Sequence, residues 1–380
     1  MARCLFALLL LTLVSCQAPL PQPAQFGANR SPLFQRQGAA RLRDPMPLIR
    51  QFHAPLIARN PELVQLKYQA MAADPFAFYR ATAFLFYSDL KAETALSQAP
   101  RVPLQGDFHL ENMGTYLSSD GRFGYDLNDF DEAVSGPAGW DLARLAVSIH
   151  LAADMTGFGF KDRQKLIGHF LGAYQAQLQK IQRQPALLQQ LLDERYLDEK
   201  AAKQVVKARE FSRVAWLTEM VQGRGFALND KVRPISPAER QAVAAALQAY
   251  AGSRREGTAF FALKDAASRI AGKGSLGRYR YLALIEGRSP APVDDLILEI
   301  KEAIVPSASY AGVSRSRNEA ERIVMAFRSA LPGVDPLLGS TSLKTPAGVL
   351  PAYVRELLPK ETVNLEKLNK TKEYEGMLNS

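Results

Sequence analysis

Two short segments of the chain are rich in oxygen-bearing side chains and follow neither a helical nor a strand-like repeat. Residues 105–112 contain Asp107 and Asn112, and residues 125–132 contain Asp129. Transfer of a phosphoryl group needs a divalent metal ion, oxygen ligands that hold this ion, and a carboxylate that orients or deprotonates the attacking hydroxyl. We therefore predict that Asp107 is the catalytic base and that Asn112 and Asp129 bind Mg²⁺.

Two residues near these segments are predicted to support the site without taking part in the chemistry. Asp141 lies in the first turns of an expected helix, where its carboxylate can accept backbone N–H bonds from residues 105–112 and fix their shape. His109 is one of only four histidines, and a hydrogen bond to the loop backbone is favoured over metal binding. Arg80 is expected to pair with a buried acid such as Asp141 rather than with phosphate.

A glycine-rich loop in the second half of the chain supplies groups that bind phosphate, which the acidic segments lack. Residues 272–277 match the pattern G-x-G-x-x-G and precede a β-prone run. A Rossmann site needs a helix at that point, so a loop that covers nucleotide phosphates is favoured. The next strand carries Lys301, which we predict to contact phosphate. The alternative is that Lys301 is a charged residue of an edge strand without a role in binding. The cofactor-binding residues predicted here are Gly272, Gly274, Ser275, Gly277 and Lys301.

A lysine in this role is expected to pair with a glutamate on the following helix, and two candidates are present there. Glu319 completes an expected capping box with Ser316, so it already has a structural role. Glu321 is therefore the predicted partner of Lys301, and we include it among the cofactor-binding residues.

Hydrophobic periodicity and capping residues divide the chain into a helical first part and a strand-rich second part. Helices are predicted at 61–73, 75–92, 137–155, 161–183 and 317–328, and from a capping box at 236–239. Strands are predicted in a hairpin at 113–125, and at 279–285, 296–300, 336–343 and 348–357. We expect an α+β fold of two lobes, with a helical catalytic lobe at 32–255 and a β-rich glycine-loop lobe at 256–380.

The first residues of the chain resemble a bacterial export signal. An apolar run at 5–14 follows Arg3 and is too short to span a bilayer. The sequence Leu-Val-Ser-Cys at 13–16 resembles a lipobox, although a core helix is the alternative for the apolar run. We expect a lipoprotein signal peptide at 1–15, lipid on Cys16, and a proline-rich linker at 16–31. The protein would then be anchored at the bacterial cell envelope, with the membrane as a partner through its N-terminal lipid.

The overall composition is that of a folded protein with a basic surface. Hydrophobic residues make up 47% of the chain, which allows a sizeable core. The formal net charge is +9, but Lys and Arg are scattered along the sequence and form no polybasic block. A solvated surface is therefore favoured, and no motif indicates nucleic-acid binding. The sequence leaves the oligomeric state open.

The motifs also resemble those of known families. Gly106, Asp107, His109, Asn112, Asp129 and residues 140–143 are similar to the segment shared by aminoglycoside phosphotransferases and other protein-kinase-like enzymes. Residues 74–80, 106–112, 126–132 and 272–277 resemble the bacterial family called domain of unknown function 2252, and this resemblance covers most of residues 40–360. It implies a two-lobed protein-kinase-like fold with circularly permuted lobes, in which the helical lobe comes first and the smaller β-rich nucleotide lobe second.

These observations together predict a phosphotransferase that uses ATP and Mg²⁺ and acts on a hydroxyl of an unknown acceptor. Two alternatives stay open. One is a ligand-binding pseudokinase displayed at the envelope without turnover, because ATP is scarce outside the cytoplasm. The other is a metal-dependent phosphohydrolase that uses the same acids. The presence of a base, metal ligands, glycine loop and lysine favours the enzyme, since a pure binding protein does not need Asp107.

Overall fold

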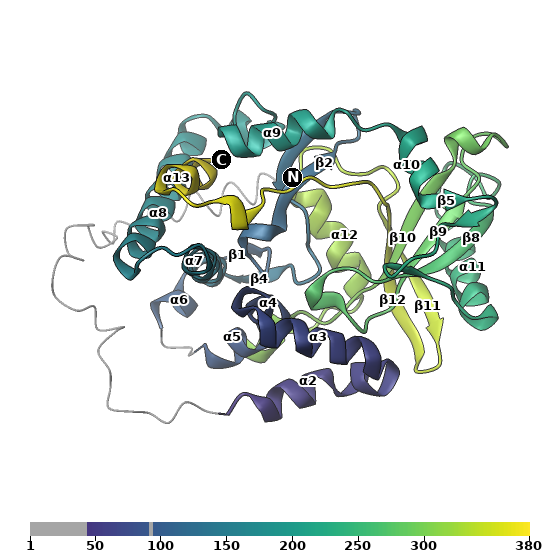
Figure 1. The fold of residues 1–380 in the computed structure, drawn as a ribbon, viewed down its shortest axis with the longest axis horizontal. Helices are drawn as coiled ribbons and strands as arrows, with labels where there is room; N and C mark the ends of the chain where they lie inside the picture. Colours follow the sequence, from purple (N-terminus) through teal and green to yellow (C-terminus); the bar gives the residue numbers. More distant parts are fainter. Residues whose placement is uncertain (1–43, 91–93) are drawn as a thin grey trace.

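The protein is a mixed α+β structure whose helices lie mostly in the first two thirds of the chain (Figure 1). The computed structural model describes residues 44–90 and 94–380, so the predicted signal peptide, Cys16 and the linker at 16–31 lie outside the described residues. Within these ranges no helix is both long and apolar enough to cross a membrane.

The α-helices are α2 (Met46–Arg59), α3 (Pro61–Ala73), α4 (Pro75–Ala81), α5 (Ala83–Asp89), α6 (Ala95–Gln98), α7 (Ala138–Met155), α8 (Phe160–Arg183), α9 (Glu199–Ala208), α10 (Arg213–Met220), α11 (Pro237–Ala251), α12 (Glu319–Ala330) and α13 (Thr371–Asn379). The strands are β1 (Arg101–Leu104), β2 (Met113–Leu117), β3 (Phe123–Leu127), β4 (Val134–Pro137), β5 (Val221–Gln222), β6 (Gly225–Phe226), β7 (Val232–Arg233), β8 (Leu263–Arg269), β9 (Arg280–Ile285), β10 (Leu296–Glu302), β11 (Gly339–Thr345) and β12 (Gly348–Glu356).

Side-chain caps set the starts of several helices. The Asn60 side chain accepts a hydrogen bond from the Leu63 N–H at 3.1 Å and begins α3, which proline also favours at the first helical position. The predicted capping box of α11 is confirmed. The Ser236 hydroxyl accepts from the Glu239 N–H at 3.2 Å, and the Glu239 carboxylate accepts from the Ser236 N–H at 2.9 Å.

The helix predicted at 75–92 is instead two short helices, α4 and α5, which meet at Thr82. The backbone of Thr82 has φ of −129°, and its hydroxyl donates to the Phe78 carbonyl oxygen at 2.7 Å. A threonine hydroxyl offers the backbone an alternative to the regular helical hydrogen bond, which favours a break at this position. The break brings Arg80 and Phe84, from different helices, to one cavity.

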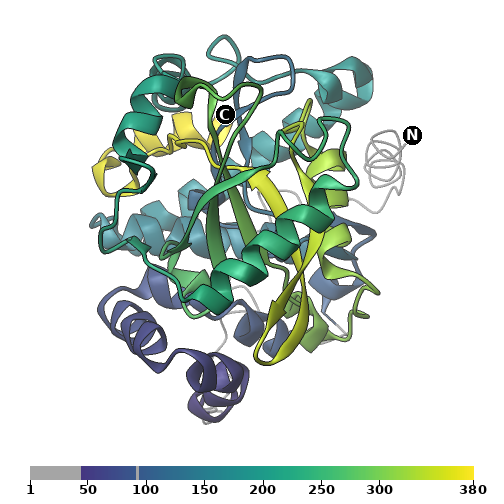
Figure 2. The same cartoon turned by 90° about the vertical axis from the view of Figure 1, so that its right-hand side faces the viewer.

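The largest sheet has six antiparallel strands in the order β11-β12-β10-β9-β8-β7. The strand β10 lies inside this sheet, and its Lys301 is aligned with Arg280 on β9 and with Tyr353 on β12. The helix α11 crosses one face of the sheet, as Figure 2 shows. The predicted hairpin is present as β2 and β3, which form a separate two-stranded sheet.

The two faces of β10 have different environments because successive side chains of a strand point to opposite sides. Leu298 and Ile300 share a core with residues of α11. Glu299 and Lys301 point to the opposite face, and Tyr353 on that face packs against α12. This second face is the one turned toward the acidic segments.

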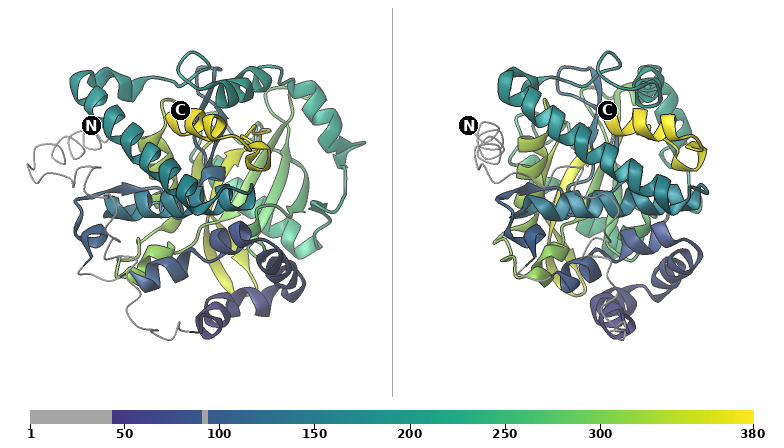
Figure 3. Two further views of the ribbon diagram at one scale, coloured as in Figure 1. Left: turned by 60° about the vertical axis from the view of Figure 1, so that its left-hand side comes forward. Right: turned by 90° about the vertical axis from the view of Figure 1, so that its left-hand side faces the viewer.

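The helices α7 and α8 form the centre of the helical layer, and the last helix of the chain, α13, packs against α8 and α9 (Figure 3). Ile149, Leu166 and Tyr374 are fully buried in their shared core. The chain returns to this layer after β12, where Thr115 on β2 exchanges hydrogen bonds with Glu361. The predicted boundary at residue 255 puts α11 in the helical lobe, although α11 packs on the six-stranded sheet. The same boundary puts α13 in the β-rich lobe, although α13 packs on the helices α8 and α9.

Candidate functional site

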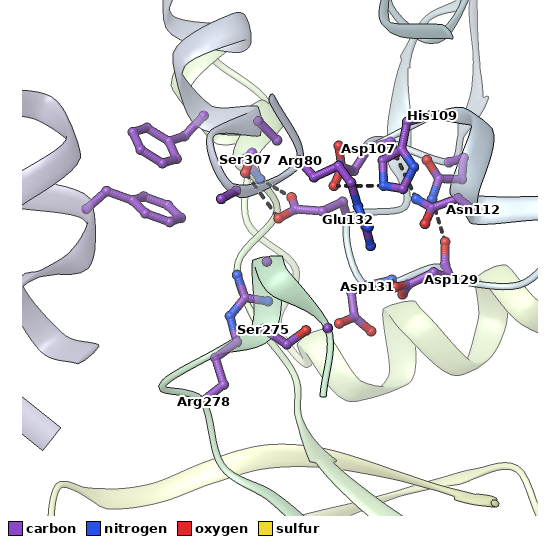
Figure 4. Close-up of a pocket in the computed structure, with 17 residues that line it drawn as sticks. Arg80, Asp107, His109, Asn112, Asp129, Asp131, Glu132, Ser275, Arg278 and Ser307 are labelled. Atoms are coloured by element: carbon purple, nitrogen blue, oxygen red, sulfur yellow. Dashed lines mark hydrogen bonds and ion pairs between the residues drawn. The ribbon is translucent and has the colours of Figure 1, made fainter. Parts of the chain in front are cut away.

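One cavity is lined by residues from both the acidic segments and the glycine loop, which are far apart in the sequence (Figure 4). Its open space is about 60 Å³. The predicted site residues that line it are Asp107, His109, Asn112, Asp129, Gly272, Gly274 and Ser275. Gly277 lies outside the lining, with a positive φ of 90°, beside Leu56 and Val64. Lys301 lies behind the lining residue Asp131.

A sharp turn at Gly106 positions the first acidic segment. Gly106 has φ of 87°, and a Cβ atom at this residue would lie 2.0 Å from the carbonyl oxygen of Glu132, so only glycine fits. The carboxylate of Asp141, in the first turn of α7, accepts hydrogen bonds from the N–H groups of Gln105 (2.6 Å) and Gly106 (3.0 Å). Asp141 thus fixes the backbone that leads into Asp107.

The side chain of Asp107 forms an ion pair with Arg144, one helical turn after Asp141 on α7. The Arg144 side chain is fully buried, and its guanidinium lies 4.4 Å from the centre of the Tyr79 ring and 5.0 Å from that of Phe86. Burial raises the pKa of Asp107 to about 7, because the charged carboxylate loses water and this outweighs the opposing effect of Arg144. A carboxyl group with this pKa can accept a proton near neutral pH.

Asn112 and Asp129 are arranged so that both can offer oxygen atoms to the cavity. The Asn112 amide nitrogen donates to the main-chain oxygen of Asp107 at 2.8 Å, so the amide oxygen is the atom free to bind a cation. Burial alone would raise the pKa of Asp129, but the positive charges of Lys301, Lys360 and Arg355 lower it to about 2. Asp129 therefore stays ionised at neutral pH.

Lys301 has a different partner from the one expected. Its ammonium forms an ion pair with Asp131, and the Asp131 carboxylate also accepts a hydrogen bond from the Tyr353 hydroxyl at 2.7 Å. Glu321 is exposed on α12, and among the described residues it forms no ion pair with Lys301. The predicted partner Glu321 is therefore wrong, and Asp131 takes its place. The reason is that Asp131 contacts the sheet face that carries Lys301, whereas the Glu321 side chain is on the exposed side of α12.

Glu319 has a structural role, although the details differ from the expected capping box. Its carboxylate accepts from the Ser316 N–H at 3.1 Å and from Arg322 at 2.5 Å. The cap of α12 is Asn318, whose side chain accepts from the Ala320 N–H at 3.0 Å. Glu319 therefore holds the start of α12 and its neighbour Arg322.

His109 is buried and neutral. Burial lowers its pKa well below the usual range, with a further contribution from the charge of Arg80. Its Nε2 atom lies 3.9 Å from an Asp107 carboxylate oxygen, and its ring makes an edge-to-face contact with Phe76. This places His109 next to the base candidate. No cluster of three or more His, Cys, Asp or Glu side chains suited to a metal ion occurs in residues 44–90 and 94–380.

Residues 59–378 match the family model described as "Uncharacterized protein conserved in bacteria (DUF2252)". The chain belongs to this family. The matched range of the DUF2252 chain includes both acidic segments, the glycine loop and Lys301. No curated protein and no solved structure matched the chain.

Three residues that complete the site of this DUF2252 chain were not predicted from the sequence, and a fourth, Arg80, was predicted with a different partner. Arg144 pairs with Asp107, and Glu132 accepts hydrogen bonds from the N–H and hydroxyl groups of Ser307. Arg278, directly after the glycine loop, lines the cavity. Arg80 also lines it and pairs with Glu111 rather than with the expected buried acid. The position of Arg144 three residues after Asp141 was the one available signal, since these positions share a helix face.

Proposed function

We propose that the protein is a kinase-like phosphotransferase with permuted lobes, which transfers a phosphoryl group from Mg²⁺-bound ATP to a hydroxyl of an unknown acceptor. The observation that supports it best is the shared cavity. Asp107, Asn112 and Asp129 line this cavity together with the glycine loop, although the loop follows much later in the chain. Acids that hold a metal ion and backbone N–H groups that hold phosphate are both needed for in-line transfer.

The order of elements around the glycine loop supports the kinase-like interpretation. The loop joins β8 to β9, Lys301 lies on the next strand β10, and α12 follows. In protein kinases a glycine-rich loop covers the phosphates, a lysine on the third strand follows, and a helix comes next. Here the same series comes after the acidic segments in the chain, as the permuted arrangement requires.

In the proposed reaction the acceptor oxygen bonds to the terminal phosphorus of ATP as the bond to the β–γ bridging oxygen breaks. The hydroxyl proton passes to a carboxylate oxygen of Asp107, and ADP leaves. Asn112 and Asp129 would hold Mg²⁺, which neutralises charge on the phosphate oxygens when it is bound. Arg144 orients the Asp107 carboxylate from behind. With two protein ligands, this ion would complete its shell with water and phosphate, as Mg²⁺ commonly does.

The cavity has to open before a nucleotide can enter it. Its open space of about 60 Å³ is well below the roughly 300 Å³ of small ligand pockets. The loop is held in place by Lys67 on α3, whose ammonium donates to the Gly274 carbonyl oxygen at 2.9 Å. Movement of the glycine loop away from α3 and α4 is the step that would enlarge the cavity.

The pseudokinase alternative keeps one supporting observation, which is the Arg144 guanidinium bound directly to Asp107. This ion pair opposes protonation of Asp107, since the charge of Arg144 lowers the pKa that burial raises. A protein in which the ion pair persists with the ligand bound would bind this ligand without turnover. Measurement of both ATP binding and ATP turnover separates the two functions.

The test is a calorimetric titration of the full chain with ATP in the presence and absence of Mg²⁺, followed by measurement of ATP turnover with pooled hydroxyl compounds. Binding that needs Mg²⁺, together with turnover, supports the phosphotransferase. Binding without turnover supports the pseudokinase. Release of phosphate without any acceptor indicates the hydrolase. Absence of Mg²⁺-ATP binding at millimolar nucleotide overturns the proposal.

A further inference from the structure

An arginine from the helical part of the chain reaches into the cavity beside the base candidate. Arg80 lies in the last turn of α4 and lines the cavity, and in Figure 4 its side chain points into it. Burial is the main cause of the shifted pKa values of Asp107 and His109, and the positive charge of Arg80 lowers the pKa of both. The Arg80 guanidinium therefore lies close to the place where the acceptor hydroxyl would lose its proton.

The helix that carries Arg80 is attached to the catalytic side of the cavity. The Tyr79 hydroxyl donates to the main-chain oxygen of Arg144 at 2.7 Å. The Phe76 ring makes an edge-to-face contact with His109, with 5.9 Å between the ring centres. These contacts hold α4 beside the base candidate independently of the glycine loop. Movement of the loop, which is the step that would open the cavity, therefore leaves Arg80 in place.

The other cations of the site act on acids of the cavity itself. Lys301 forms an ion pair with the lining residue Asp131. Arg144 forms one with Asp107, the base candidate. The charge of Arg278 acts on a third lining acid. Release of any of these cations would leave an uncompensated negative charge next to the phosphate oxygens.

Arg80 differs from these cations because its partner lies outside the cavity. The carboxylate of Glu111 forms the ion pair with Arg80, but Glu111 does not line the cavity, and its side chain is 37% exposed. Water can replace the guanidinium at Glu111, and pairs with an exposed member contribute little to stability. The Arg80 Nε atom is buried and has no hydrogen-bond partner among the described residues. The protein therefore uses the Arg80 guanidinium only in part.

We propose that Arg80 is a catalytic residue, which leaves Glu111 and binds the oxygens of the phosphoryl group during its transfer. This inference deepens the proposed function and rests on it for the reaction. Negative charge on the non-bridging oxygens has to be stabilised in the transition state, and an arginine of the same chain can do this. The planar guanidinium can bind two of these oxygens at once. Arg80 neither gives nor takes a proton, and the acceptor proton still passes to Asp107.

The test compares Arg80→Met and Arg80→Lys with the wild-type full chain. Calorimetry measures the affinity for Mg²⁺-ADP alone and for Mg²⁺-ADP with aluminium fluoride, which imitates the phosphoryl group during transfer. Arg80→Met should lower the rate of transfer from ATP about 10²- to 10³-fold. It should weaken the aluminium fluoride complex at least about tenfold and change Mg²⁺-ADP affinity less than about threefold, because the contact belongs to the transition state. Arg80→Lys keeps the charge and should recover part of both losses.

A change at Glu111 separates a catalytic role of Arg80 from a structural one. Glu111→Gln removes the competing negative charge, so it should strengthen the aluminium fluoride complex about two- to fivefold, in the direction opposite to Arg80→Met. If the ion pair only holds α4 to the acidic segment, both changes should weaken this complex and lower the temperature of thermal unfolding. That result would overturn the inference.

The matched control is Arg163→Met on α8. Arg163 forms an ion pair with Asp154, and its side chain is 15% exposed, compared with 19% for Arg80. The control removes a similarly buried helix arginine away from the cavity, so it should leave nucleotide binding and transfer unchanged.

The inference and the proposed function fail in different ways. Transfer by Arg80→Met at a rate within about threefold of the wild type overturns the inference and leaves the phosphotransferase. Wild-type protein that binds the aluminium fluoride complex through Arg80 but transfers no phosphoryl group upholds the phosphate contact and removes the phosphotransferase. Absence of any Mg²⁺-nucleotide binding by the wild type overturns both.

Discussion

Replacement of Arg144 by methionine tests whether the buried ion pair with Asp107 holds the first acidic segment in place. The Arg144 side chain is fully buried between Tyr79 and Phe86, and methionine keeps much of this apolar packing. The substitution leaves the Asp107 carboxylate buried without its cation. Breaking a buried pair from one side costs about 3–5 kcal/mol of the free energy of unfolding, so we expect a loss of this size at pH 8.

The loss in free energy of unfolding caused by Arg144→Met should be larger at pH 8 than at pH 6. Without Arg144 the pKa of Asp107 rises further above its value of about 7, and the carboxyl group keeps its proton at both pH 6 and pH 8. In the wild type it is mostly protonated at pH 6 and mostly ionised at pH 8. The destabilisation by Arg144→Met should therefore be about 1.4 kcal/mol smaller at pH 6 than at pH 8, which corresponds to one pKa unit.

The assay is urea unfolding at both pH values for the wild type, Arg144→Met, Asp107→Asn and the double variant. The double variant should recover at least about 1 kcal/mol relative to the sum of the single changes, because the two side chains are in contact. Lys165→Met, which removes an exposed ion pair on α8, is the control and should change stability by less than about 0.5 kcal/mol. A loss below about 1 kcal/mol for Arg144→Met at pH 8 would refute a structural role for the pair.

Three further predictions concern Asp107, Asp129 and Cys16. The rate of phosphoryl transfer should rise as pH increases through about 7. Asp107→Asn should lower this rate about 10²- to 10⁴-fold while Mg²⁺-ATP binding persists in calorimetry. Because the pKa of Asp107 is raised in the folded protein, the wild type should also lose stability relative to Asp107→Asn as pH rises from about 4 to about 7. Asp129→Asn should weaken Mg²⁺-ATP binding itself, since it removes a charged metal ligand, and binding equal to that of the wild type would exclude this role. In a bacterium, Cys16→Ser should stay unprocessed or leave the membrane fraction, because stable anchoring needs the multiple acyl chains of a mature lipoprotein; wild-type protein found unlipidated in the cytosol would contradict the export prediction.

Local signals in the sequence predicted the helices α3, α7, α8, α11 and α12 and the strands β2, β3 and β9 to β12, but they missed helices such as α2 and α9 and the short strands β1 and β4 to β8. The proline and capping residues at α3 and α11 fixed their starts, and short β-prone apolar runs indicated β9 and β10. The division at Thr82 escaped prediction because the apolar spacing continues across it and one side-chain hydrogen bond decides the outcome. Such a competition between a hydroxyl and the helix backbone is not visible in periodicity.

The ion-pair partners of charged residues were harder to predict from the sequence than the helices and strands. Lys301 was assigned to Glu321 because both lie in consecutive elements, whereas Asp131 reaches Lys301 from a segment far away in the sequence. Nothing local distinguishes the two acids. The same holds for Arg278, since its place beside Gly277 gives no sign that it lacks an ion pair. Proximity in the chain predicts pairs within one helix well and pairs between segments poorly.

The charges around the cavity also indicate what kind of ligand would complete it. Two of its four acids are paired with a cation within the protein, Asp107 with Arg144 and Asp131 with Lys301. A third, Glu132, accepts hydrogen bonds from Ser307. In the part of the chain that the structure describes, Asp129 and Arg278 line the same cavity without an ion pair, although the positive charges of Lys301, Lys360 and Arg355 act on Asp129 and the charge of Arg278 acts on Glu132. A lone cation would satisfy Asp129 and repel Arg278, and a lone anion would do the reverse. A metal ion bound to a phosphate chain satisfies both at once, so metal and phosphate should bind cooperatively, and Mg²⁺ alone should bind more weakly than Mg²⁺ together with tripolyphosphate.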